Sequence, residues 1–217
     1  MTTYEIIENE KIVVIVRQLY GDNLLRLAHS LFAGGIRLME VTFDQKDPNH
    51  LEKTSAAIRL LNDEFKDEMR FGVGTTLTEK HVTYAHQAGA QFIISPNSNK
   101  QVILKSKELG LISIPGAMTP TEILQASEWG ADYIKIFPVG SLGLKFCKDI
   151  MAPINHLKLL ATAGVSEENF GQLLSLGFAG AGISGRLTDK KLISEGNWGE
   201  FTKRARVFVD IAKNVNQ

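Results

Sequence analysis

Short apolar segments recur along the whole of the 217-residue chain, and they limit its possible folds more than any other feature. Each segment is five to seven residues long and rich in Val, Ile, Leu and Ala. Apolar runs of this length are typical of strands that are covered on both faces, as in a parallel sheet. The predicted strands span residues 11–17, 36–42, 70–74, 91–95, 111–115, 132–137, 157–162 and 178–183.

Amphipathic segments separate these strands, and they predict helices over residues 22–32, 80–88, 119–129, 166–176 and 197–215. The sequence Thr119-Pro120-Thr121-Glu122 is typical of a helix start, because Thr caps early amides, Pro suits the first turn and Glu completes a capping box. Most strands begin about twenty residues apart, which gives eight strand–helix units. The repeat predicts an α/β fold, a (β/α)8 TIM barrel that forms a single domain over residues 1–217. An open doubly wound sheet is the alternative.

The charge balance excludes several classes of function. Lys and Arg number 24, as do Asp and Glu, so there is no basic excess for nucleic acid, and no nucleic-acid partner is expected. No apolar run approaches the roughly 18 residues of a spanning helix, so no membrane partner is expected. Residues 1–10 lack a signal-peptide core and Cys147 is the single cysteine, a pattern that favours a cytoplasmic enzyme. Cys147 is expected to be apolar filler rather than a nucleophile.

Two charged residues stand where the catalytic groups of such a barrel gather, at the carboxyl ends of the strands. Lys135 interrupts an apolar strand, and Glu40 lies near the end of another. Burial favours the neutral amine that attacks carbonyl groups, and a carboxylate nearby can move protons. Structural roles remain open for both: the Lys135 head can reach water, and Glu40 can form an ion pair, for example with Lys135.

Glycine-bearing turns follow the last two predicted strands, at residues 162–166 and 180–185. Loops at these places in a barrel commonly hold phosphate, and Ser184 can add a hydroxyl donor, although tight packing also requires glycine. Thr75 can bind a carboxylate or cap a helix, and Arg17 can bind a carboxylate or form a surface ion pair. These features predict an anionic small-molecule substrate.

The histidines do not suggest a metal site. His81 and His86 lie five residues apart, which turns them to different faces of a helix, and no carboxylate motif completes a site there. We expect both on solvated helix faces. No metal ion and no other cofactor is expected.

A series of motifs, in order along almost the whole chain, resembles one enzyme family. The motifs are Ile15-Val16-Arg17, Met39-Glu40-Val41-Thr42, Gly72-Val73-Gly74-Thr75, Ile94-Ser95-Pro96, the segment 114–122 and Ile134-Lys135-Ile136-Phe137-Pro138. They are similar to those of the class I aldolases that cleave 2-keto-3-deoxy-6-phosphogluconate (KDPG), grouped with 4-hydroxy-2-oxoglutarate (KHG) aldolases. The resemblance extends from Val13 to about Leu187.

The resemblance implies a pyruvate-forming aldol cleavage without metal, in which Lys135 forms an imine and Glu40 moves protons. It also implies a homotrimer with a keto-acid substrate as its small-molecule partner. It assigns Arg17 and Thr75 to the pyruvate carboxylate, Thr162 to the substrate chain, Pro96 and Phe137 to the pocket around the imine, and Gly164, Ser184 and Gly185 to the phosphate.

Three departures from the family pattern concern the substrate. Phe43-Asp44-Gln45-Lys46 stands where many members carry an arginine, so Arg17 or Lys46 is expected to replace it. The Thr-Gly-Gly and Gly-Ser turns appear as Thr162-Ala163-Gly164 and Ser184-Gly185-Arg186. The leading expectation is KDPG, cleaved to pyruvate and glyceraldehyde 3-phosphate, with KHG cleavage to pyruvate and glyoxylate close behind. The galactonate epimer, another phosphate-binding barrel enzyme and a non-catalytic metabolite-binding barrel are the alternatives.

Overall fold

The structure is a computed structural model that describes residues 1–215, in which strands and helices alternate along the chain. The strands are β1 (Ile12–Val16), β2 (Leu38–Thr42), β3 (Arg70–Gly74), β4 (Phe92–Ile94), β5 (Ile112–Ile114), β6 (Gly116–Ala117), β7 (Ile134–Ile136), β8 (Leu159–Thr162) and β9 (Gly180–Ile183). The helices are α1 (Thr3–Glu10), α2 (Gly21–Ala33), α3 (His50–Phe65), α4 (Glu79–Gln87), α5 (Lys100–Glu108), α6 (Pro120–Glu128), α7 (Val139–Met151), α8 (Phe170–Ser175), α9 (Lys190–Ser194) and α10 (Trp198–Asn214).

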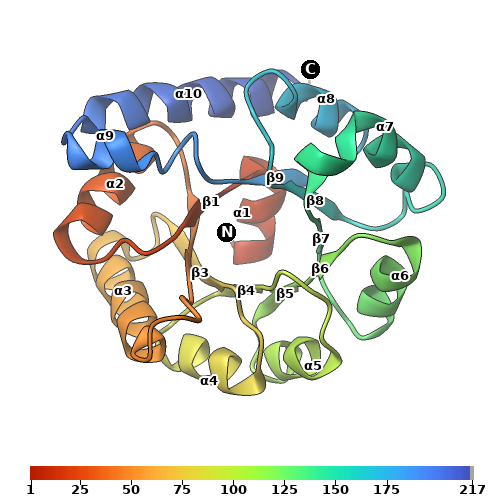
Figure 1. Ribbon diagram of the computed structural model, residues 1–217, viewed down its shortest axis with the longest axis horizontal. Helices are drawn as coiled ribbons and strands as arrows, with labels where there is room; N and C mark the ends of the chain where they lie inside the picture. Colours follow the sequence, from red (N-terminus) through yellow and green to blue (C-terminus); the bar gives the residue numbers. More distant parts are fainter. Residues whose placement is uncertain (216–217) are drawn as a thin grey trace.

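The strands form one parallel sheet in the order β5-β4-β3-β2-β1-β9-β8-β7-β6. Because β5 and β6 are consecutive pieces of one chain segment, separated only by Pro115, the two ends of this order meet and the sheet closes into a barrel. Figure 1 shows helices α2 to α10 as a ring around it. The predicted single-domain TIM barrel is confirmed. The predicted strand 111–115 continues past its expected end, and its pairing is interrupted at Pro115, since proline has no amide hydrogen to donate to the sheet.

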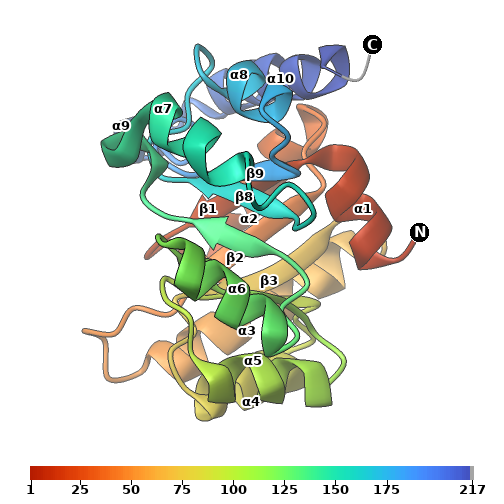
Figure 2. The same cartoon turned by 90° about the vertical axis from the view of Figure 1, so that its right-hand side faces the viewer.

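Helix α1 precedes the first strand and was not predicted from the sequence. Its N-cap Thr2 and the side chain of Glu5 form a capping box, a pattern that is visible in the sequence. Ile6 and Ile7 of this helix are buried in the interior of the barrel. Figures 1 and 2 show α1 covering one open end of the barrel, so that end is closed.

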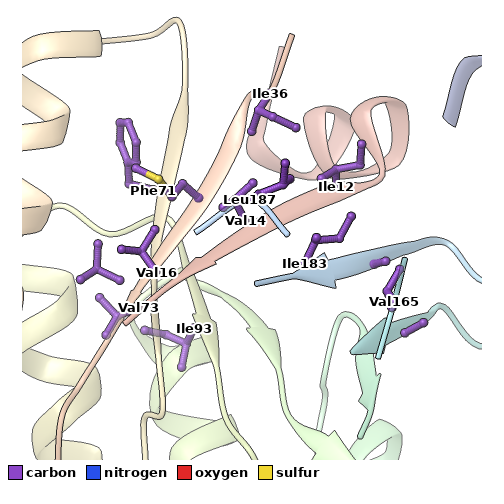
Figure 3. Packing of buried hydrophobic residues seen from close by; sticks show 14 of the residues in the cluster. Ile12, Val14, Val16, Ile36, Phe71, Val73, Ile93, Val165, Ile183 and Leu187 are labelled. Carbon is purple, nitrogen blue, oxygen red and sulfur yellow. The ribbon is translucent and has the colours of Figure 1, made fainter. Parts of the chain in front are cut away.

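Buried side chains divide between the two faces of the sheet. Val14 and Val16 of β1 and Val73 of β3 point outward and pack beneath the helices (Figure 3). Val13 of β1 points inward, since successive residues of a strand face opposite sides. The inward-facing cluster comprises Ile6, Ile7, Val13, Leu38, Phe92, Ile94, Ile114, Tyr133 and Leu160. Because Ile6 and Ile7 of α1 belong to this cluster, the interior of the barrel beneath α1 is apolar.

Two glycines of β3 leave room inside the barrel. A Cβ atom on Gly72 would lie 2.2 Å from the ring of Phe92, and one on Gly74 would lie 2.4 Å from a carboxylate oxygen of Glu40. Both distances are too short for any side chain. The first glycine therefore allows a core ring, and the second allows an acid, to occupy the interior. No helix in the described part of the chain is long and apolar enough to cross a membrane.

Candidate active site

Lys135 points into the barrel. Its neighbours in β7, Ile134 and Ile136, belong to the outward-facing core, while Tyr133 belongs to the inward-facing cluster. Strand alternation therefore turns Lys135 inward. Its side chain is 7% exposed, and desolvation lowers the pKa of its ammonium group. The Nζ atom lies 4.9 Å from the centre of the Phe137 ring. The alternative in which the lysine head reaches water does not fit this burial.

Glu40 is a second ionisable group inside the barrel. It is 1% exposed, and burial raises the pKa of its carboxyl group, although the positive charges of Lys135 and Arg17 act in the opposite direction. Its Oε2 atom has no hydrogen-bond partner among the described residues. Burial thus lowers the pKa of Lys135 and raises the pKa of Glu40. Both shifts favour the uncharged forms, which are a neutral amine and a protonated acid.

Two adjoining cavities open at the carboxyl ends of the strands, away from α1. The larger has a volume of about 690 Å³, and the predicted residues on its wall are Arg17, Thr75, Ser184 and Gly185. The smaller has a volume of about 290 Å³, shares Arg17, Ser184 and Gly185, and adds Thr162 and Gly164. The structure therefore brings these six predicted residues together around one entrance.

Lys135 and Glu40 lie below this entrance rather than in its wall. Glu40 contacts Gly74, which immediately precedes Thr75 on the cavity wall. Lys135 pairs with Leu160, two residues before Thr162, in the register of β7 and β8. Each ionisable group thus lies next to a strand whose end borders a cavity.

Arg17 is anchored between the two cavities. Its Nη1 atom donates a hydrogen bond of 2.9 Å to Ser184 Oγ, which in turn donates one of 3.3 Å to the carbonyl oxygen of Ile15. Arg17 contributes to the pKa of both Glu40 and Lys135. Its guanidinium can therefore act on an anion bound beside Ser184 and on the charges of the barrel interior.

Pro96 lines neither of these two cavities. A Cβ atom on Gly116 would lie 2.4 Å from its carbonyl oxygen, and Gly116 pairs with Lys135 in the sheet register. Pro96 is therefore positioned one strand away from the lysine. Its expected contact with an imine stays a prediction.

Three residues with positive φ follow the strands that end at the entrance. Thr75 has a φ of 54°, Gln18 has 54° and Ala163 has 65°. Side chains other than glycine rarely adopt this region, and a β-branched residue such as Thr75 does so least readily. Backbone strain of this kind gathers at functional sites, where the surrounding structure maintains it.

The expectation of solvated histidines is wrong for His81. Only 7% of it is exposed, its ring lies 4.7 Å from the ring of Phe43, and its Nε2 atom lies 3.4 Å from Nε2 of His50. Burial lowers the pKa of His81 to about 4. Helical periodicity could not reveal this contact, because His50 lies on α3 and His81 on α4.

Within residues 1–215, no group of three or more His, Cys, Asp or Glu side chains is arranged to hold a metal ion.

Gln18 and Asp44 also line the larger cavity, together with Lys46 and Lys190. Gln18 was not predicted to belong to the site, because it lies in no motif and follows the strand rather than ending it. Asp44 was not predicted either, since in the sequence it stands out only as a departure from a family pattern.

The arrangement suits covalent chemistry on a small anionic carbonyl compound. A lowered pKa increases the fraction of neutral amine, the form that attacks carbonyl groups, and a buried acid can exchange protons with the groups it meets. The entrance offers a guanidinium, hydroxyl groups and glycine backbone for binding an anion.

The family described as KDPG and KHG aldolase matches residues 4–204 of the chain. A Haemophilus influenzae protein named 2-dehydro-3-deoxy-phosphogluconate aldolase is 32% identical over 216 residues, which cover 98% of this chain and 99% of that protein. An Escherichia coli protein named 2-dehydro-3-deoxy-6-phosphogalactonate aldolase is 29% identical over 177 residues, covering 81% of this chain and 83% of that protein.

Among solved structures, a KDPG aldolase from Legionella pneumophila superposes with a TM-score of 0.82 and 25% identity, covering 95% of this chain and 97% of that chain. That structure holds pyruvate, captured at low pH as a covalent carbinolamine intermediate. The family match, the relatives and the fold agree with the motifs that surround Lys135 and Glu40. The chain belongs to the KDPG and KHG aldolase family of carbon–carbon lyases.

Proposed function

We propose that the chain is a Schiff-base aldolase that cleaves KDPG to pyruvate and glyceraldehyde 3-phosphate. The observation that carries this proposal is the inward-facing, buried Lys135, whose pKa is lowered by desolvation inside a barrel that also buries Glu40. The Legionella pneumophila relative, with its covalent pyruvate carbinolamine, supports the same chemistry.

In the proposed reaction, the neutral amine of Lys135 attacks the C2 ketone and forms a carbinolamine. The protonated Glu40 carboxyl gives its proton to the C2 hydroxyl, which leaves as water, and a protonated imine remains. The resulting Glu40 carboxylate takes the proton of the C4 hydroxyl, and the C3–C4 bond breaks with its electron pair moving toward the imine. Glyceraldehyde 3-phosphate leaves, the enamine takes a proton at C3 from Glu40, and water hydrolyses the imine to release pyruvate.

The entrance provides the proposed binding groups. Thr75 and Arg17 would bind the carboxylate of the keto acid, and Thr162 would face the substrate chain. Gly164, Ser184 and Gly185 would bind the phosphate, because they border the smaller cavity beside the Arg17 guanidinium. Phe137 and Pro96 would form part of the pocket around the imine.

Two other substrates belong to the same proposal. The galactonate epimer of KDPG differs at one hydroxyl-bearing carbon, and the Escherichia coli galactonate relative supports it. KHG lacks the phosphate, and relatives named KHG/KDPG aldolase support that activity. Initial rates of pyruvate release from all three compounds would rank them.

Borohydride trapping with pyruvate, read by mass spectrometry, tests the proposal. We expect one pyruvate-derived adduct, located on Lys135, and none in Lys135→Ala. Failure of the native protein to form an adduct would favour a phosphate-binding barrel enzyme that uses no imine. A non-catalytic binding barrel would keep its affinity for pyruvate in Lys135→Ala and release no product in either form.

We further propose that the protein is a homotrimer. Light scattering would then give three times the mass of the chain. A mass of one or two chains would contradict this assembly.

A further inference from the structure

His50 and His81 form a hydrogen-bonded link behind the wall of the larger cavity. The Nε2 atom of His81, on α4, lies 3.4 Å from Nε2 of His50, at the start of α3. The ring centre of Phe43 lies 5.7 Å from that of His50 and 4.7 Å from that of His81. Because Phe43 also lines the larger cavity, the histidine pair supports that wall from behind.

The partners of the other two ring nitrogens determine where each histidine carries its proton. The backbone amide of Leu77 donates a hydrogen bond of 3.0 Å to His81 Nδ1, so the proton of a neutral His81 is on Nε2. His50 Nδ1 lies 2.7 Å from the carbonyl oxygen of Asp47, which can only accept, so the proton of a neutral His50 is on Nδ1. His81 Nε2 therefore donates to His50 Nε2, and each ring nitrogen makes one hydrogen bond.

A further proton on either ring breaks this chain of hydrogen bonds. On His81 the proton would enter at Nδ1, where it would face the amide hydrogen of Leu77. On His50 it would enter at Nε2, where it would face the hydrogen of His81. In both cases two donors oppose each other, so the link between the rings requires that both are uncharged.

The groups around the pair also favour an uncharged His81. Burial, the neighbouring His50 and the Lys80 ammonium lower the pKa of His81 from an ordinary value of 6.5 to about 4. The carboxylate of Asp47, which interacts with His50, is itself paired with Lys53. The closed pair therefore excludes a proton that a freely exposed His81 ring would take up between pH 6.5 and about pH 4.

The two loops that the pair joins carry part of the cavity wall. The β2–α3 loop contributes Asp44, Gln45 and Lys46, and the β3–α4 loop contributes Thr75. Gln45 Nε2 donates a hydrogen bond of 3.2 Å to the carbonyl oxygen of Thr75, so the loops are bonded at the cavity as well as behind it. Loss of the histidine link would loosen this wall and displace the groups that it presents.

We propose that His50 and His81 are positioning residues: as uncharged rings they hold the β2–α3 and β3–α4 loops at the larger cavity, and proton uptake releases the loops and weakens substrate binding. The use of this cavity by a keto acid rests on the proposed function. Because the released state binds one proton more than the closed state, its population rises about tenfold for each pH unit below 6.5. Acid therefore weakens binding through two groups that do not touch the substrate.

Hydrogen exchange of the Leu77 amide tests the inference without any substrate. In the native protein its protection factor, corrected for the chemical exchange rate, should fall about 30-fold from pH 6.5 to pH 5.0, the change expected for one proton over that interval. In His81→Asn the fall should be less than about threefold, because the asparagine Oδ1 can accept from Leu77 and does not titrate. An equal fall in both proteins, or none in the native protein, would overturn the inference.

Two further variants test the link itself. His50→Ala removes the acceptor for His81 Nε2, so at pH 7.5 the protection factor of Leu77 should fall about fivefold, the size expected for one hydrogen bond. His86→Gln is the matched control, because it removes an exposed histidine from the same helix and should match the native protein at every pH. An unchanged Leu77 in His50→Ala, or a changed one in His86→Gln, would overturn the inference.

The release must also be local. In the native protein at pH 5.0, the Leu77 amide should exchange faster than the amide of Ile134 in β7, which belongs to the barrel. Equal exchange rates would mean that the whole protein unfolds rather than the two loops, and would overturn the inference.

Steady-state kinetics relates the link to the site. The rise in KM for KDPG from pH 7.5 to pH 5.0 should be about fivefold larger in the native protein than in His81→Asn, because only the closed fraction binds substrate well. Titration of Lys135 and Glu40 is common to both proteins and cancels in this comparison. An equal rise would overturn the positioning role. Failure of the native protein to trap pyruvate with borohydride would instead contradict the proposed function, and the Leu77 measurements would still test the link.

Discussion

Glu40 and Lys135 enter the interior of the barrel from β2 and β7, strands that lie across the barrel from one another in the closed sheet. Both are almost completely buried, and burial raises the pKa of Glu40 and lowers the pKa of Lys135. Each shift favours the uncharged form of the group. The protein therefore keeps two ionisable groups where a purely structural barrel would place apolar side chains. If they carry the proposed chemistry, we expect both positions to lower the stability of the fold relative to apolar side chains.

Lys135→Met should stabilise the protein at neutral pH by about 0.5–2 kcal/mol and remove imine formation. The folded pKa of Lys135 lies below its unfolded value, so the folded protein binds fewer protons and its stability rises with pH up to the unfolded pKa. The stability gap between the variant and the native protein should therefore be widest near pH 7 and narrow toward pH 10. Urea unfolding at both pH values measures it; a gap that widens with pH would contradict the burial argument.

Glu40→Gln should lower kcat by roughly 10²- to 10⁴-fold, the range expected when a proton-transferring group is lost. Glutamine fits the space beside Gly74, so the fold should be retained. Pyruvate should still be trapped on Lys135, but more slowly. A kcat within threefold of the native value would show that another group moves the protons.

Gly74→Ala and Gly72→Ala form a matched pair on one face of β3. The new methyl group at position 74 meets the Glu40 carboxylate, and the one at position 72 meets the Phe92 ring. We expect Gly74→Ala to lower kcat about 100-fold through misplacement of the acid. Gly72→Ala should instead lower stability by roughly 1–3 kcal/mol through overpacking. Equal losses of stability in both variants, with equal activity, would contradict the difference.

Ala163→Gly should raise stability by up to about 1 kcal/mol. Ala163 has a φ of 65°, a conformation that costs an L-residue roughly 1–2 kcal/mol, and the greater freedom of glycine in the unfolded chain offsets part of the gain. Ala161→Gly, in the buried strand just before it, should be destabilising. Urea midpoints of the two variants should move in opposite directions, and a shift of both in one direction would be evidence against strain at position 163.

Tyr133→Phe should lower stability by about 1 kcal/mol and leave catalysis unchanged. The Tyr133 hydroxyl donates a hydrogen bond to Glu8 of α1, at the end of the barrel away from the entrance. Glu8 also pairs with Lys158 at 3.1 Å, so it does not lose every partner. The kcat/KM value should stay within twofold of the native value. A larger loss would mean that a change at the closed end of the barrel affects catalysis.

The strand–helix repeat predicted the barrel because each unit leaves its own apolar run and its own amphipathic face in the sequence. The direction of Lys135 could not be predicted in the same way. Its strand is apolar on both faces, and only the closed sheet reveals which face is the interior. Helix α1 was not predicted because it belongs to no strand–helix unit, although its capping box is present in the sequence.

The candidate site likewise combines residues that the sequence pattern predicted with contacts that it did not. The rule that parallel strands share one functional edge predicted four residues of the entrance, Arg17, Thr75, Thr162 and Ser184. Gly164 and Gly185 were expected in the turns after the last two strands, and they border the same entrance. The contacts of Asp44 with Gln18, and of His50 with His81, join segments far apart in the sequence. No local pattern encodes such pairs, because the sheet order and the loop conformations bring them together.

The closure of the barrel by α1 sets an order for molecules that use the site. Ile6 and Ile7 fill the far end, so any reactant must arrive and depart on the side of Arg17 and Thr75. In the proposed reaction, the fragment attached to Lys135 would then lie innermost, with the aldehyde between it and solvent. Cleavage would release aldehyde before pyruvate, and synthesis would admit pyruvate before aldehyde. The closed end of the barrel, together with the proposed bond to Lys135, would thus give the reaction an ordered kinetic mechanism.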